Sequence, residues 1–209
     1  MFNLFKKKPP ITTLRLYALQ KQGDDYIQRP QLLKGVFAAW KSVTGTLPED
    51  FDIDGPYGIA KGRTVGLKSF LSKLQKKGHS AYHGYTGVHE DHGGLHVSFF
   101  EAPPYSAAFV EIVLWLYEPN AVDAAVEMVR QLLAMHKIDY GYLIELPHDH
   151  DPVSEPRIKR GILGTSISVG NNSLNKWHRQ VQTLQDGLVR DIYSLNFLNA
   201  KQVEQITHL

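Results

Sequence analysis

The clearest pattern of hydrophobic and polar positions lies in the middle of the chain. Residues 96–100 are β-rich, and two consecutive prolines follow them closely and end the run, because proline cannot continue a sheet ladder. Residues 107–117 (AAFVEIVLWLY) are almost continuously apolar, which predicts a strand covered on both faces. Apolar positions then recur at helical spacing over 122–133, and a further strand is predicted at 140–146.

Two elements precede this unit. Residues 12–19 alternate apolar and polar side chains as a strand does, and residues 30–44 carry an apolar helical stripe that includes Trp40. Together these segments give the order β-α-β-β-α-β. That is the order of a ferredoxin-like α+β domain, an antiparallel sheet with helices on one face. A lysine-rich helix at 64–77 is then an insertion before the second strand.

The pattern divides the chain into three parts. We expect a flexible basic lead-in at 1–10, an α+β core domain at 11–147 and a C-terminal α/β extension at 148–209 that packs on the core. The extension should contain a strand at 162–169, a helix at 172–186, a strand or ordered loop at 188–198 and a helix at 200–207. Within the core, loops are expected at 47–61 and at 80–94, the second with room for a short strand at 81–85.

Composition narrows the classes of protein. The chain has 209 residues, of which 43% are hydrophobic and 21% charged, as in ordinary globular proteins. It has no cysteine, which excludes disulfides, thiolate zinc sites and cysteine nucleophiles. The first ten residues lack the charge order of a secretory signal, and no apolar run approaches the roughly 18 residues of a membrane helix. We therefore expect a cytoplasmic protein without a membrane partner.

Charge is segregated along the sequence. Residues 101–155 hold ten acidic side chains against two basic ones, a net charge of −8, whereas 61–77 hold six bases and no acid. Such segments can steer partners of opposite sign, or they can simply be solvated faces of separate elements. The basic helix, followed by Tyr82 and Tyr85, suggests a nucleic-acid-binding module as an alternative. The central strands lack the aromatic and basic signature of RNA-recognition domains, which argues against that alternative.

Histidines and carboxylates are the candidate reactive groups. His89, His92, His148 and His150 could hold zinc or manganese and activate a water, which gives a metal-dependent hydrolase as a second alternative. Their spacing matches no known metal motif. Glu111, within the apolar run at 107–117, is expected to face solvent or to pair with a basic side chain. Because no complete catalytic constellation is visible, we expect no enzyme, no metal and no cofactor.

The last candidate lies near the C-terminus. Arg190, Asp191, Ile192 and Tyr193, with Asn196 and Leu198, resemble an Arg-Asp-(Val/Ile)-Tyr-x-x-Asn-x-Leu stretch in predicted immunity proteins of bacterial polymorphic-toxin and type VI secretion systems. The resemblance implies a non-enzymatic protein that neutralises a cognate secreted toxin, a nuclease for example. The same residues can instead be scaffold, with Arg190 and Asp191 satisfying backbone groups and the residues Ile192, Tyr193, Phe197 and Leu198 filling the core.

An acidic surface is what a blocker of a basic toxin would present, because charge complementarity speeds encounter and sets orientation. The toxin contacts are expected in 47–58, in 118–123 or in 148–155, and the sequence does not choose among these segments. The acidic candidates are Glu118, Asp123, Asp149, Asp151 and Glu155.

Overall fold

The computed structural model describes residues 9–20, 29–54, 63–77, 84–101, 107–118, 121–155, 158–161, 164–167 and 172–207. The expected lead-in at 1–8 and residues 81–83 of the expected short strand lie outside these ranges. The described elements are, in chain order, β1 (Ile11–Gln20), α1 (Arg29–Thr44), β2 (Asp50–Asp54), β3 (Val65–Gly66), α2 (Leu67–Lys77), β4 (Gly84–His89), β5 (Gly93–Phe100), β6 (Ala108–Leu116), α3 (Ala121–Met135), β7 (Tyr140–Leu146), β8 (Ile158–Gly161), β9 (Gly164–Ile167), α4 (Asn172–Gln180), a 3₁₀ helix (Val181–Asp186), β10 (Leu195–Leu198) and α5 (Ala200–Thr207).

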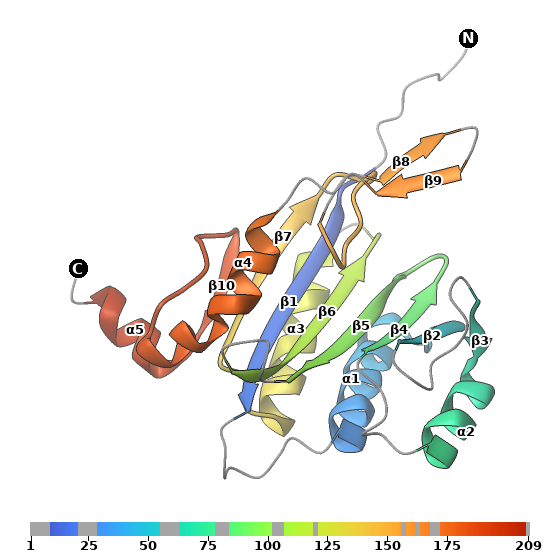
Figure 1. The fold of residues 1–209 in the computed structure, drawn as a ribbon, viewed down its shortest axis with the longest axis horizontal. Helices are drawn as coiled ribbons and strands as arrows, with labels where there is room; N and C mark the ends of the chain where they lie inside the picture. The colour runs from blue at the N-terminus through green and yellow to red at the C-terminus, as the bar shows by residue number, and fades with distance from the viewer. Residues whose placement is uncertain are drawn as a thin grey trace.

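Eight strands form one open antiparallel sheet in the order β10-β7-β1-β6-β5-β4-β2-β3 (Figure 1). The central pair is β1 and β6, which stay in register from Thr12 opposite Leu116 to Gln20 opposite Ala108. The C-terminal extension supplies the outer strand β10, which pairs with β7. β8 and β9 form a separate hairpin, which projects beyond the end of the sheet in Figure 1.

The two faces of the sheet carry different layers. Because side chains alternate along a strand, β1 directs Leu14 and Leu16 to one face and Tyr17 to the other. The first face packs on α1 and α3, with the fully buried Trp40 between them and the sheet. The second face packs on α4 and the 3₁₀ helix, through Trp177 among others. Figure 1 accordingly shows α1 and α3 behind the sheet and α4 in front of it.

The predicted α+β class with an antiparallel sheet is confirmed, and so is the helix at 200–207. The observed element order is longer than β-α-β-β-α-β, because β2, β3, α2 and β4 come between α1 and β5. The predicted strand at 162–169 is confirmed over the described residues 164–167, which form β9, whereas its hairpin partner β8 was not predicted. The predicted helix at 172–186 changes to a 3₁₀ helix after Gln180.

The expected loops at 47–61 and 80–94 are wrong where they contain strands. β2 reads DFDID, and its alternation buries Phe51 and Ile53 while the intervening aspartates remain more exposed. β4 and the start of β5 are rich in glycine. Because glycine has no side chain, the sequence there does not show the alternation of apolar and polar residues that is typical of a strand. Pairing between these strands sets their structure, with His89 opposite Gly93 and Gly84 opposite Ser98.

The glycines at the start of β5 allow close packing against β6. A Cβ atom built on Gly94 would lie 2.3 Å from Cζ2 of Trp115 and 2.5 Å from the carbonyl oxygen of Gly87. A Cβ atom on Gly93 would lie 2.0 Å from the carbonyl oxygen of Trp115, and Gly93 also has a φ of +114°. Only glycine fits at these two positions without displacement of the neighbouring backbone.

We therefore expect Gly94→Ala to lower the free energy of unfolding by about 2–4 kcal/mol, because the new methyl group overpacks a rigid contact with backbone. Urea denaturation followed by circular dichroism measures the change. Gly66→Ala is the matched control, since the nearest atom to its Cβ would be 3.9 Å away. Equal stability of the two variants would show that the close approach at Gly94 is relaxed at little cost.

Candidate functional site

A charged side chain lies in the centre of the sheet. Arg15 is fully buried on β1, on the second face, between neighbours on β6 and β7. Its guanidinium Nη1 donates to Oε1 of Glu111 at 2.7 Å, and its Nε lies 3.1 Å from Oε1 of Glu155. Nη2 donates to the carbonyl oxygens of Pro152, at 2.9 Å, and of Val153. One arginine thus joins β6 to the segment that follows β7.

Glu111 of β6 is the first counter-ion of Arg15. The same carboxylate oxygen accepts a hydrogen bond from the hydroxyl of Tyr17 at 2.9 Å and lies 3.1 Å from Nε2 of His178 on α4. Burial alone would raise the pKa of Glu111, but Arg15 and the hydrogen bonds from His178 and Tyr17 hold it well below its ordinary value. Glu111 is therefore ionised over the whole physiological range of pH.

Glu155 is the second counter-ion. It faces Arg190 through two contacts of 3.2 Å each, and it accepts a hydrogen bond from the hydroxyl of Tyr142 at 3.1 Å. Burial opposes the charge, but Arg15 and Arg190 hold the pKa of Glu155 below its ordinary value. The residue has a φ of +65°, a left-handed conformation that is strained for a side chain of this kind. The ion pairs with both arginines offset that strain.

Tyrosines line the same region and remain protonated. Burial raises the pKa of Tyr17 and Tyr142 well above their ordinary value and raises the pKa of Tyr140 to about 12. Tyr142 stacks on Tyr193, with the ring centroids 4.0 Å apart. The hydroxyl of Tyr140 donates to Oδ1 of Asn196 at 3.2 Å. These contacts fasten the C-terminal extension to β7.

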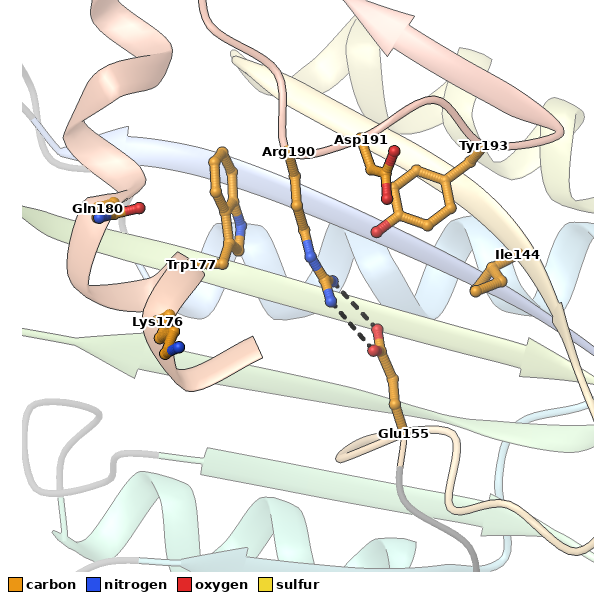
Figure 2. A pocket seen from close by; sticks show the side chains of 8 residues that line it. All are labelled: Ile144, Glu155, Lys176, Trp177, Gln180, Arg190, Asp191 and Tyr193. Carbon is orange, nitrogen blue, oxygen red and sulfur yellow. Dashed lines mark hydrogen bonds and ion pairs between the residues drawn. The ribbon is translucent and has the colours of Figure 1, made fainter. Parts of the chain in front are cut away.

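A pocket of about 400 Å³ opens beside this network, between α4 and the segment before β10 (Figure 2). The pocket is lined by Ile144, Glu155, Lys176, Trp177, Gln180, Arg190, Asp191 and Tyr193. Arg190 and Glu155 meet in the middle of the view, with Trp177 on one side and Tyr193 with Ile144 on the other. The fully buried Arg15 and the half-buried Arg190 face two buried glutamates, so these four charges compensate one another.

The C-terminal motif is brought to this pocket, and the scaffold interpretation of it is right in part. Arg190 is bound to the Glu155 carboxylate and to the Tyr142 hydroxyl, two side-chain contacts that the scaffold interpretation did not include. Asp191 is exposed, and its Oδ1 accepts a hydrogen bond from the backbone N–H of Ile192. The expectation that Ile192 fills the core is wrong, because this side chain is 88% exposed. The backbone here turns outward so that Arg190 and Tyr193 can point inward.

The candidate metal ligands lie at the end of the sheet where β4, β6 and β7 finish. The rings of His89 and His92 are 4.6 Å apart, and Nδ1 of His92 meets Oε1 of Glu118. His148 instead packs on Tyr117, with ring centroids 5.8 Å apart. His150 lies 3.2 Å from Asp149. No group of three or more possible ligands is placed to hold a metal ion among the residues that the structure describes.

The predicted partner-binding acids are not all on the surface. Glu118, Asp123 and Asp149 are exposed. Asp151 is half-buried and accepts hydrogen bonds from the backbone N–H groups of Val153, at 3.2 Å, and Ser154, at 3.1 Å. Glu155 is 8% exposed and bound to the two arginines, so it holds the fold together instead of presenting charge to solvent.

Sequence reasoning missed Arg15 and His178. The sequence does place a lone arginine, Arg15, within the mostly apolar segment that forms β1. A charge in a buried strand needs a buried counter-ion, so this residue indicates an internal ion pair. Glu111 in the apolar run of β6 was the matching signal, and its expected pairing with a basic side chain is confirmed. If the lone arginine of β1 and the lone glutamate of β6 had been considered together, the sequence would have predicted the ion pair between Arg15 and Glu111. It would not have predicted the contribution of Glu155.

We expect Glu155→Gln to lower the free energy of unfolding by about 3–5 kcal/mol, because it leaves a buried arginine charge partly uncompensated. Glutamine keeps the size and the backbone strain of the native residue, so the charge alone is tested. The control is Glu127→Gln, which breaks an exposed ion pair with Arg130 and should change stability by about 0.5 kcal/mol or less. Chemical denaturation measures both, and a small effect of Glu155→Gln would mean that water enters the network.

The lowered pKa values of Glu111 and Glu155 set the acid stability. In the unfolded chain both carboxyl groups have their ordinary pKa of 4.5. As the pH falls to that value and below it, the unfolded state therefore binds more protons than the folded state. Their contribution is complete above about pH 4.5 and declines as the pH falls toward the folded values, with a slope of about 1.4 kcal/mol per pH unit for each group. Urea midpoints from pH 6 to pH 2.5 measure the decline, and a flat profile would contradict the pairing.

We compared the chain with protein-family models and with curated proteins. No protein-family model matches this chain, and no curated protein matches it significantly. The functional conclusion therefore depends on the geometry of the chain itself.

Proposed function

We propose that this chain is a non-enzymatic immunity protein, which binds a cognate secreted bacterial toxin through an acidic surface at one end of its sheet. The surface, here named the acidic end, consists of Glu49, Glu90, Asp91, Glu118, Asp123 and Asp149. The single observation that carries the proposal is that exposed carboxylates from four separate parts of the sequence converge there.

Strand pairing establishes the convergence. Gly93 pairs with His89 and with Leu116, and Leu116 also pairs with Thr12, so β4, β5, β6 and β1 meet at this end. Ile11 pairs with Leu146, which adds the end of β7. Direct contacts continue the row from one element to the next: Glu49 with His89, His89 with His92, His92 with Glu118, and Tyr117 with His148.

The carboxylates of the acidic end are exposed to solvent to a substantial degree. The side chains of Glu49, Glu118 and Asp149 are 67%, 43% and 45% exposed, in contrast to the buried Glu111 and Glu155. An exposed row of one sign favours a partner that presents lysine and arginine, such as a nuclease that binds nucleic acid. The charged groups of the interior are already paired, which favours binding over chemistry as the role of this chain.

Two finer interpretations belong to this proposal. β7, β1, β6 and β5 are neighbours in the sheet, and we take them with α1 and α3 as a ferredoxin-like core to which β4, β2, β3 and β10 are added. We place the protein in the cytoplasm, where an immunity protein would meet a toxin that enters or is made in the cell. Among the described residues, no helix has both the length and the apolar character needed to cross a membrane.

The test is co-expression with the toxin encoded beside this gene in the native genome. We expect the native chain to protect the cell and to form a stable complex with that toxin. A triple variant, Glu49→Gln, Glu118→Gln and Asp149→Asn, should weaken binding by roughly 10- to 100-fold at low salt, because three attractive charge contacts are lost. Biolayer interferometry over a range of salt concentrations measures the affinity.

The matched control changes three exposed acids elsewhere, Glu127→Gln, Asp186→Asn and Glu204→Gln, and alters the net charge by the same amount. An equal loss in both triple variants would contradict the assignment of the acidic end. A toxin that neither binds the native chain nor is neutralised by it would overturn the proposal.

A further inference from the structure

We infer that the pocket between α4 and the segment before β10 is a binding site for a ligand that carries a carboxylate on an apolar body. This inference does not rest on the acidic end or on the proposed immunity function. It rests on three features of the pocket: the hydrogen-bonding groups that are already engaged, the groups that are not, and the nature of the walls.

The Glu155 carboxylate in the pocket is already engaged through both of its oxygens. Oε1 of Glu155 accepts from Tyr142 and Arg190 and lies beside Nε of Arg15, and Oε2 accepts from Arg190. Asp191, the other carboxylate of the lining, is exposed, and its Oδ1 accepts a hydrogen bond from a backbone N–H at 2.8 Å. A ligand that arrives with a cationic head would therefore compete with two arginines for Glu155, which is unfavourable.

The donors on α4 have no such partner. Within the described part of the chain, the side chains of Lys176 and Gln180 make no hydrogen bond or ion pair, and both line the pocket. Nε1 of Trp177 is buried without an acceptor, and the residue is 7% exposed. Because positions 176 and 180 are one helical turn apart, their side chains lie on the same side of α4 as a pair. Lys176, Trp177 and Gln180 thus offer donors on the α4 side of the pocket, and Figure 2 shows Asp191 on the opposite side of Arg190, so an anion is favoured beside α4.

The walls favour an apolar body behind that anion. Trp177 and Tyr193 supply aromatic surface on opposite sides, and Ile144 of β7 supplies aliphatic surface (Figure 2). The volume of about 400 Å³ falls within the range of roughly 300–1,000 Å³ that is common for small-ligand sites. A phenylalkanoate, or an acidic side chain next to an aromatic one in a peptide, matches this combination.

The indole nitrogen of Trp177 adds a specific donor and a reporter. Figure 2 shows this nitrogen on the edge of the ring that faces Arg190. It exposes less than 1 Å² to solvent, so a ligand oxygen reaches it only after a small rotation of the ring or of Arg190. Lys176 and Gln180 therefore make the first contacts with the carboxylate, and Trp177 closes on it afterwards. An unsatisfied buried donor has a free-energy cost of about 1–3 kcal/mol, which favours this second contact.

The test uses the purified full chain, without any toxin, and two probes of nearly the same size and shape: the anion 4-phenylbutyrate and its neutral amide. The indole N–H resonance of Trp177, assigned by its absence in Trp177→Phe, reports binding in ¹H–¹⁵N spectra. We expect saturable shifts of this resonance with the carboxylate and at least tenfold weaker binding of the amide. A blocked peptide, acetyl-Phe-Glu-Phe-amide, distinguishes a protein side chain from a free acid as the source of the carboxylate.

Binding of either the free acid or the peptide, with the amide weaker, supports the inference. Lys176→Met should weaken that binding by about tenfold, whereas Lys41→Met on the exposed side of α1 should leave it unchanged. The inference is overturned if neither probe moves the Trp177 resonance, if the amide binds as well as the acid, or if Lys176→Met has no effect. Since no toxin is present, these outcomes are independent of the test of the immunity function.

Discussion

The architecture depends on Arg15, whose buried guanidinium needs negatively charged partners inside an apolar sheet. A buried guanidinium without a partner would cost several kcal/mol, so the chain must bring carboxylates to it. One comes from the neighbouring strand as Glu111, and the other comes from the segment after β7 as Glu155. Glu155 in turn requires Arg190, and Glu111 draws in His178. The four-charge group therefore ties the segments that hold Glu155, His178 and Arg190 to the centre of the sheet.

This arrangement explains why two unusual local features persist. Glu155 keeps a left-handed backbone conformation because its carboxylate must reach two arginines at once. Ile192 remains exposed because the backbone that places Arg190 and Tyr193 against the network turns the intervening side chain outward. Both features are unfavourable locally and are compensated by contacts that lie far away in the sequence.

The acidic residues of segment 101–155 fall into two groups, those that are buried and hold the fold together and those that are exposed. Of the ten acids in 101–155, Glu111, Asp139 and Glu155 are buried, and they accept hydrogen bonds or ion pairs within the fold. Others, such as Glu118 and Asp149, are exposed at the acidic end, where each contacts a histidine. Net charge counted along the sequence therefore overstates the charge that the surface presents. It still points to one end of the sheet, because β6 and β7 finish there and are followed by Glu118 and Asp149.

The sequence by itself determined the α+β class, the apolar strands β1, β6 and β7, and the helices α1, α3 and α5, because their hydrophobic periods are local. It also pointed to Arg190 and Tyr193, through the motif. Only the tertiary structure decided that the acidic DFDID segment and the glycine-rich segment at 84–94 are strands, since pairing with neighbours, not propensity, holds them. It also decided that Glu155 is internal and that Glu118 is not. An isolated carboxylate carries no sign of its future partner, because burial of a charge depends on which side chains the fold brings within about 3 Å of it.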